Sequence, residues 1–166
     1  RDVNNPYCVI SYKKWMNYCL NTANKLVIEN KKVTKYSREK NYFKIITDDN
    51  NEFFAENVYD SRFRGSKNNE LIQHFFGINI ETKEKNFDEN KLTLMHFTEE
   101  DNVLHFIYTL PFSQNKALIE STVFSKNVLD ENWYRNKIYK YLNNFNINKY
   151  KEVSIEKGVI PMFFSD

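Results

Sequence analysis

The sequence predicts an α+β fold in which helices pack on a mainly antiparallel sheet. Two stretches carry apolar residues at the three- and four-residue spacing of amphipathic helices, and several shorter runs alternate residues of high β propensity. Aromatic residues make up 16% of the 166 residues, whereas there are only 3 Gly and 3 Pro. This composition favours regular elements over long loops.

Composition also limits the classes of partner. A hydrophobic content of 41% is enough for the core of one domain, or of a piece of a larger protein. The 24 basic and 22 acidic residues are interspersed, so the sequence shows no electrostatic footprint for nucleic acid. Cys8 and Cys19 lack the spacing of a metal site, which favours a reduced, cytoplasmic protein. The chain begins at Arg1 rather than Met and has no signal peptide, so we expect a processed chain or a fragment.

The first 62 residues predict a helix followed by a β-meander. Ser11 is a suitable N-cap for a helix that ends near Asn24 and buries one apolar stripe. The stripe consists of Tyr12, Trp15, Met16, Cys19 and Leu20. Four short runs separated by polar turn residues predict strands at 26–29, 32–38, 42–47 and 52–59. The polar segment 64–70 then marks the best internal boundary.

Beyond that boundary, four longer runs predict one broad antiparallel sheet with at least three mutually paired strands. They cover 71–83, 91–98, 102–110 and 116–124. Asp130 then caps a helix that we expect to pack on this sheet. Its apolar stripe consists of Trp133, Tyr134, Ile138, Tyr141, Leu142 and Phe145. A last strand covers 150–156, and Pro161, which has no N–H, excludes a central ladder position shortly after it.

One carboxyl group lies among apolar residues of the predicted strand 116–124. Period two places Glu120 between Leu118 and Thr122 on one face, and the other face is also mainly apolar. Loss of solvation there would raise the pKa of Glu120 and make it a proton donor near neutral pH. The alternative is a glutamate on an edge strand that is solvated or paired with a lysine.

No other constellation indicates a particular chemistry. His74, His96 and His105 fall on predicted strands without diagnostic metal spacing, so we interpret them as core or cross-strand histidines rather than ligands. Gly65 with its neighbouring arginines does not make a phosphate loop. The sequence contains no GxGxxG, Walker or GxSxG motif.

A series of short motifs resembles the lycopene cyclase family, the flavoproteins that close the end rings of carotenoids. The matching segments, in order, are Asp60-Ser61-Arg62, Gln73-His74-Phe75-Phe76-Gly77, Phe87-Asp88 with Thr93-Leu94-Met95, Leu110-Pro111-Phe112-Ser113, and Gly158-Val159-Ile160-Pro161-Met162. Together they span about residues 57 to 162. Two positions depart from the family pattern, since His96 replaces the usual Asp and Phe163-Phe164 replace a small polar residue.

The resemblance implies a hydroxylase-type flavoprotein fold of which this chain is the central part. Residues 1–62 would belong to the FAD-binding domain, 63–157 would form the substrate-binding sheet, and 158–166 would return toward the FAD domain. The family's glycine-rich nucleotide motif and its carboxy-terminal flavin segment are absent. The resemblance therefore implies reduced FAD in the complete protein only, and this fragment alone is expected to be inactive.

The resemblance also implies roles for individual residues. Glu120 matches the first glutamate of the family's acidic motif and would be the acid that protonates the polyene, whereas Ser121 replaces the second acidic residue. Asp60 and Arg62 would lie near the cofactor. The residues implied in substrate binding are Phe112, Glu156 and Pro161. No metal is implied.

The implied substrate is a linear carotenoid such as lycopene, taken up by a cytoplasmic protein associated peripherally with the membrane. Cyclisation would begin with protonation of a terminal double bond and end with loss of a proton, without net redox change. Two rival interpretations remain open: another flavoprotein of this fold, either a hydroxylase or a prenyl-lipid reductase, and a non-catalytic domain that binds an apolar ligand.

Overall fold

The computed structural model describes residues 7–23, 25–62, 71–100 and 102–162, and the chain divides into two units, Arg1–Ser61 and Arg62–Asp166. The elements are two helices and two antiparallel sheets, which confirms the α+β class. The predicted boundary segment 64–70 lies outside the described residues.

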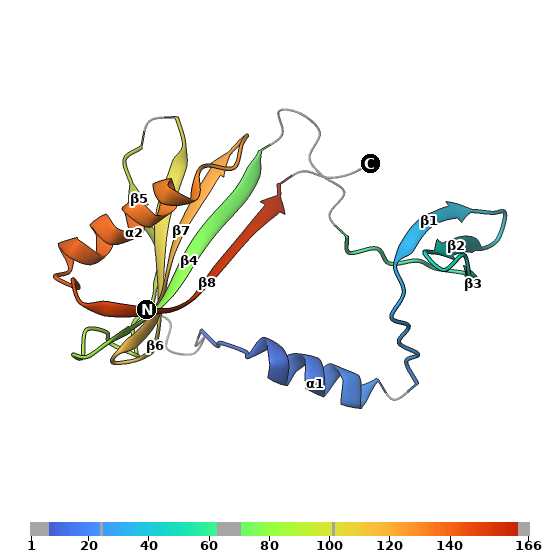
Figure 1. Cartoon of the computed structure of the whole chain (residues 1–166), viewed down its shortest axis with the longest axis horizontal. Coiled ribbons are helices and arrows are strands. Elements are labelled where there is room, and N and C mark those ends of the chain that lie inside the picture. Colours follow the sequence, from blue (N-terminus) through green and yellow to red (C-terminus); the bar gives the residue numbers. More distant parts are fainter. Residues whose placement is uncertain (1–6, 24, 63–70, 101, 163–166) are drawn as a thin grey trace. The chain divides into compact units, whose positions relative to one another are not determined.

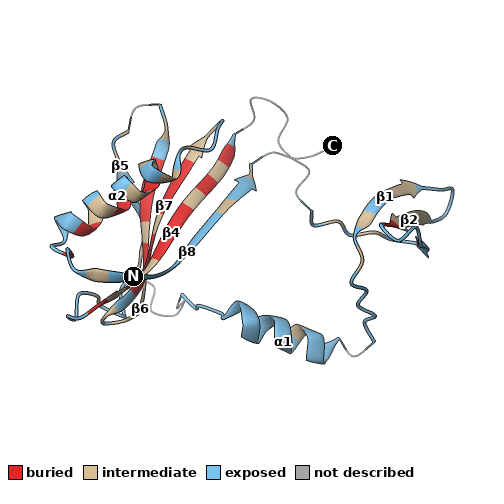
Figure 2. Ribbon diagram, in the orientation of Figure 1, coloured by how far each residue is buried: buried red, intermediate tan, exposed pale blue. Residues whose placement is uncertain are grey.

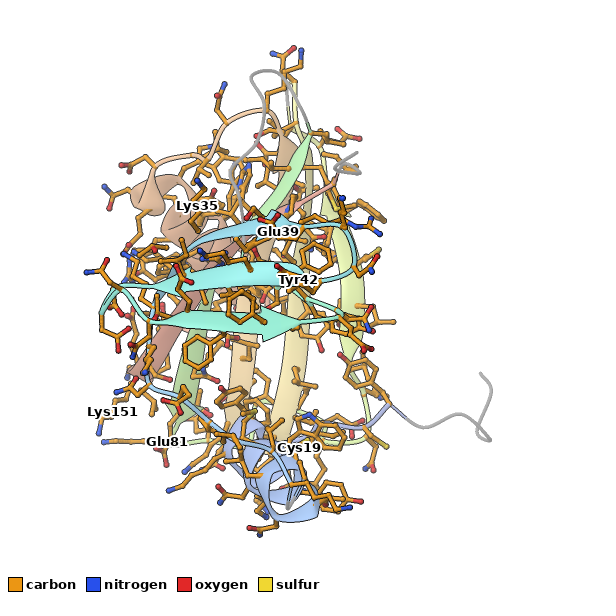
Figure 3. All side chains as sticks on the ribbon, turned by 90° about the vertical axis from the view of Figure 1, so that its right-hand side faces the viewer. Cys19, Lys35, Glu39, Tyr42, Glu81 and Lys151 are labelled. Carbon is orange, nitrogen blue, oxygen red and sulfur yellow. The ribbon has the colours of Figure 1, made fainter. Side chains whose placement is uncertain are left out.

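The first unit contains helix α1 (Tyr12–Thr22) and a three-stranded meander of β1 (Val33–Arg38), β2 (Phe43–Thr47) and β3 (Glu52–Ala55). The meander is confirmed, although its last strand ends at Ala55 rather than near residue 59. Glu39 and Tyr42, labelled in Figure 3, close the β1–β2 turn through a 2.8 Å bond from the Glu39 N–H to the Tyr42 carbonyl.

Three expectations for this unit are wrong. No residue of α1 is buried, and the side chain of Ser11 makes no capping bond, although Ser11 holds the N-cap position. Residues 26–29 are not a strand, because no neighbouring segment pairs with them and a lone strand leaves its backbone groups to water. The apolar stripe of α1 is therefore exposed, since periodicity marks a face that can be buried without supplying its partner.

The second unit contains a five-stranded antiparallel sheet with one helix across one face (Figure 1). Its elements are β4 (Ile72–Thr82), β5 (Thr93–Thr98), β6 (Leu104–Ser113), β7 (Lys116–Ser125), α2 (Glu131–Asn144) and β8 (Tyr150–Pro161). The strand order is β5-β6-β7-β4-β8. The prediction of at least three paired strands between residues 71 and 124 is confirmed.

The edge strand β8 is longer than the sequence predicts. It continues past residue 156 to Pro161, which pairs with Ile72 at the end of the ladder. Pro161 is tolerated because β8 lies at the sheet edge and the missing N–H faces no further strand.

Helix α2 covers the core of this unit. The side chain of Asp130 accepts a 2.9 Å bond from the Asn132 N–H, so the predicted cap is confirmed. Tyr134, Ile138 and Leu142 are buried against the sheet. Tyr141 is only partly buried and Phe145 is exposed, because the helix ends at Asn144 and Phe145 lies at its C-cap. Figure 2 shows buried and partly buried residues following one another along β4, and the alternation is interrupted where Gly77 is also buried.

Two buried histidines lie between the sheet and α2. Ser125 Oγ gives its hydrogen to the Asn127 carbonyl at 2.6 Å, so it accepts from Nε2 of His74 at 2.8 Å. Nδ1 of His74 then accepts from the Tyr134 hydroxyl. His105 also lies between two hydroxyl groups, with Nδ1 against Thr98 and Nε2 against Ser121. Both are therefore core histidines, as the sequence indicates.

These histidines predict a loss of stability in acid. Burial lowers the pKa of His105 from 6.5 to about 4 and also lowers the pKa of His74. Because the unfolded chain then binds more protons than the folded one between pH 6.5 and 4, stability must fall as the pH falls through this window. The loss from His105 alone is about 3 kcal/mol. Urea unfolding at a series of pH values measures this loss. His105→Gln should reduce the dependence of the free energy of unfolding on pH between 6.5 and 4. An unchanged pH dependence in that variant would show that His105 is not its source.

Candidate functional site

Side-chain alternation divides the sheet of the second unit into two different faces. His105 and Trp133 have ring centroids 5.0 Å apart, and Thr109 is 3.1 Å from the Tyr141 hydroxyl, so odd-numbered residues of β6 face α2. The β6–β7 register pairs Tyr108 with Glu120, which places both on the opposite face. The candidate site lies on this second face, away from α2.

Glu120 lies at the middle of the middle strand. Strand β7 has β6 on one side and β4 on the other, so the alternative of a glutamate on an edge strand is wrong. Its directly paired neighbours are Tyr108 on β6 and Gly77 on β4. Gly77 is in turn paired with Glu156 on β8. The two glutamates therefore lie on the same face at the same level of the sheet, with a glycine between them.

Gly77 leaves no room for a side chain. A Cβ atom added there would be 2.9 Å from Cδ1 of Leu118, 3.1 Å from Cγ of Glu156 and 3.5 Å from Cβ of Glu120. The space above Gly77 is thus already shared by its neighbours on both sides. A glycine within a strand commonly marks such a close approach.

The surroundings of Glu120 favour its protonated form. Burial raises the pKa of its carboxyl above 4.5; the 2.7 Å hydrogen bond donated by Thr122 opposes this shift, and the charge of Glu156 adds to it. Thr122 is fully buried and Leu118 nearly so, so the carboxyl group has little solvent on its own strand. The sequence-based expectation about the direction of this pKa agrees with the structure.

An aromatic row runs across the same face. Phe97 on β5 and Phe106 on β6 have ring centroids 5.7 Å apart, and Phe106 and Phe124 on β7 follow at 6.3 Å. Phe97 and Leu104 are more than half exposed. This face therefore offers apolar surface beside the two carboxyl groups, a combination suited to an apolar ligand that exchanges a proton.

Two of the other predicted site residues of the second unit, Phe112 and Pro161, lie away from Glu120 in the sheet. Phe112 is exposed beside the irregularity between Pro111 and Ser113, near the β6–β7 turn. Pro161 pairs with Ile72 at the opposite end of the sheet. Asp60 is partly buried and Arg62 is exposed, and each has an interaction partner. The roles of these four residues in ligand binding stay predictions.

Sequence reasoning assigned no role in the site to Gly77 or Tyr108. The signal for Gly77 was an isolated glycine inside a strand pattern, which indicates close backbone or side-chain approach. Tyr108 carried no such signal, because only the β6–β7 register brings it beside Glu120.

A hollow of about 770 Å³ lies at one end of the sheet, away from Glu120. Glu81 and Lys151, paired on β4 and β8 and labelled in Figure 3, line it together with Asn115 of the β6–β7 turn. Its lining includes Lys83, Lys149 and Lys151 and neither glutamate of the site. It is therefore separate from the candidate site.

The described residues contain no group of three or more His, Cys, Asp or Glu side chains placed to hold a metal ion. Neither helix in the described ranges is long and apolar enough to cross a membrane.

The residues that the structure describes do not fit the dinucleotide part of FAD. A diphosphate site of the common type needs a glycine-rich turn at the start of a helix. The two glycines in the described ranges, Gly77 and Gly158, lie within strands, and neighbouring side chains fill the space beside them.

Comparison with known proteins gives a family assignment. The second unit is an antiparallel sheet that carries a partly buried glutamate on the face away from α2. The chain belongs to the lycopene cyclase family, since the family model described as "Lycopene cyclase protein" matches residues 2–165. No curated protein sequence matches it.

Among solved structures, the chain is similar to the crystal structure of tetracycline destructase Tet(51), with 14% identity and a TM-score of 0.39. The similarity covers 82% of this chain and 42% of that one, so this chain matches less than half of that protein's length.

Proposed function

We propose that the protein to which this chain belongs closes the end rings of a linear carotenoid such as lycopene, with Glu120 as the acid that starts the reaction. The observation that carries the proposal is a glutamate with a raised pKa on the middle strand of an aromatic sheet face, in a member of the lycopene cyclase family. The reaction class is an isomerisation, because the acid adds one proton and the product loses another.

In this proposal, some residues of the chain bind the polyene and others transfer the proton. Phe97, which is more than half exposed, and the partly exposed Phe124 flank the buried Phe106 and offer apolar surface along which an extended chain can lie. Glu120, protonated and poorly solvated, donates to a terminal double bond, and the resulting cation is attacked by an internal double bond. The Thr122 hydroxyl, 2.7 Å from Oε1 of Glu120, fixes the carboxyl group for this transfer.

We propose FAD as the cofactor of the complete protein, on the basis of family membership and without assigning it a step. The proposed Asp60 and Arg62 contacts would belong to that cofactor. A linear carotenoid dissolves in the bilayer, so we also propose that the protein meets it at the cytoplasmic membrane surface.

Product mass and solvent labelling test this function. The complete protein, with FAD reduced, is supplied with lycopene in ordinary water and in D2O, and the carotenoids are resolved by chromatography. We expect cyclic product of unchanged mass in ordinary water and one solvent deuteron per ring in D2O, because the proton from Glu120 exchanges with solvent.

The rival functions give other masses. A hydroxylase would add an oxygen atom, a reductase would add two hydrogen atoms, and a non-catalytic domain would return the substrate unchanged. Any of these three results would contradict the cyclase proposal.

A further inference from the structure

Three strands contribute side chains, and β4 contributes Gly77, at one level of the sheet face that points away from α2. In spatial order these residues are Tyr108, Glu120, Gly77 and Glu156. Adjacent strands are about 4.8 Å apart, so the two glutamate backbones are separated by two strand spacings, and Gly77 itself places no side chain between them. Glutamate side chains that lean toward each other can cover such a gap.

We propose that Glu120 and Glu156 form a proton-sharing pair across Gly77, in which Glu156 accepts the proton that the substrate loses after ring closure. The assignment to Glu156 rests on the proposed cyclisation, whereas the coupling of the two carboxyl groups does not. Glu156 thereby gains a role in proton transfer rather than in substrate binding alone.

With this pair, every proton and electron of the cyclisation is accounted for. A proton leaves the Glu120 carboxyl and forms a C–H bond on the terminal double bond, which leaves a carbocation. The electrons of an internal double bond form the ring bond and move the positive charge into the ring. A ring C–H bond then breaks, its electron pair forms the new double bond, and the proton passes to the Glu156 carboxylate. Transfer from Glu156 to Glu120 restores the starting state, so no oxidant or reductant is consumed.

The surroundings of Glu120 suit a proton donor, and those of Glu156 suit a proton acceptor. Glu120 is partly buried on the middle strand, whereas Glu156 is exposed on the edge strand β8. Poor solvation favours the protonated acid at Glu120, and the nearby charge of Glu156 raises the pKa of Glu120 further. Two close carboxyl groups in unlike surroundings are a common source of an acid and a base at one pH.

Other charged groups near the pair are few in the described ranges. On β6, Tyr108 faces Glu120, and on β4 the first charged residue of this face is Glu81, which is 3.5 Å from Lys116 of β7. On β8, Lys157 points to the other face, where its Nζ is 3.6 Å from Glu131 of α2. Glu120 therefore has no lysine or arginine at its own level, and Glu156 is the other carboxyl group at that level.

The coupling is tested first without any activity measurement. The free energy of unfolding is measured between pH 4 and 8 for the protein and its Glu120→Gln variant. Because the folded pKa of Glu120 is raised, its contribution is fully present below pH 4.5 and is lost as the pH rises through the folded pKa. The difference in the free energy of unfolding between the two proteins, followed against pH, therefore reports the titration of Glu120.

The same comparison is then repeated in the Glu156→Gln background. We expect the pKa of Glu120 to move to lower pH, because the neighbouring charge is gone. The matched control is Glu89→Gln, which removes an exposed glutamate of the β4–β5 loop and should leave the titration in place. An unchanged titration in the Glu156→Gln background would overturn the pair.

Activity then tests the direction of proton flow. Glu156→Gln should lower ring closure about 10²- to 10⁴-fold, because glutamine cannot accept the proton that the ring loses. Lycopene recovered from D2O should still acquire deuterium, because Glu120 can still protonate it reversibly. A normal rate of ring closure would overturn the role of Glu156 even if the coupling holds. If the unmutated protein makes no cyclic product, the proposed function is wrong, whereas the coupling of the two carboxyl groups is still supported by the unfolding experiment.

Gly77→Ala provides an independent variant with a close control. The new methyl group would press on Glu156 and Leu118, between the two carboxyl groups. Gly158→Ala is equally crowded, with a Cβ 2.7 Å from Cζ of Phe75, but it lies outside the pair. We expect Gly77→Ala to lower the pKa of Glu120 and Gly158→Ala to leave this pKa unchanged. Equal changes in the two variants would count against the pair.

Discussion

Glu120→Gln is expected to lower the rate of ring closure by about two to four powers of ten, the usual scale for loss of a general acid. Glutamine keeps the size of the side chain and still accepts the hydrogen bond from Thr122. It removes only the acidic proton, so lycopene should still bind. The rate is measured in the complete protein with reduced FAD, by extracting carotenoids and separating monocyclic from bicyclic products.

Two further variants separate chemistry from folding. Glu120→Asp should recover only part of the rate, because a carboxyl group retracted by one methylene misplaces its proton. The control is Glu89→Gln, an equivalent change in an exposed loop of the same unit, which should retain the full rate. Folding is checked by bound flavin. A Glu120→Gln variant that binds flavin and cyclises at the unmutated rate would show that the acid is another residue.

Ile138→Ala is expected to give a large loss of stability, about 2–5 kcal/mol in the free energy of unfolding. Ile138 has no exposed surface and lies in the α2 stripe between Tyr134 and Leu142, in the core cluster shared with β4 and β7. Alanine is a better helix former than isoleucine, so the loss must come from the cavity and the lost burial rather than from helix propensity.

Urea unfolding, with both the midpoint and the denaturant dependence (m-value) determined, measures this change in the free energy of unfolding. The matched control is Lys140→Ala, which truncates an exposed residue of the same helix and should change stability by less than about 0.5 kcal/mol. Similar losses in both variants would mean that α2 is not anchored to the sheet through this stripe.

The second unit was largely predictable because its local patterns agree with its tertiary contacts. Runs of alternating apolar residues between 71 and 124 became β4 to β7, and Asp130 caps α2 as its position before an apolar stripe indicates. In the first unit the pattern alone misled. The stripe of α1 and the run 26–29 have the composition of buried elements, but no described partner covers either of them. Periodicity reports which side chains can be buried together, and burial itself needs a second surface.

The site shows the same division between pattern and contact. By itself the sequence determined that Glu120 lies on a strand among apolar residues, because period-two alternation and residue type are local properties. Only the tertiary structure decided that β7 is the middle strand, that Tyr108 and Gly77 flank Glu120, and that Glu156 reaches the same level from the edge. Strand order and register join residues that are tens of positions apart in the chain. These pairings depend on the packing of the whole sheet, and no single stretch of sequence contains the information that sets them.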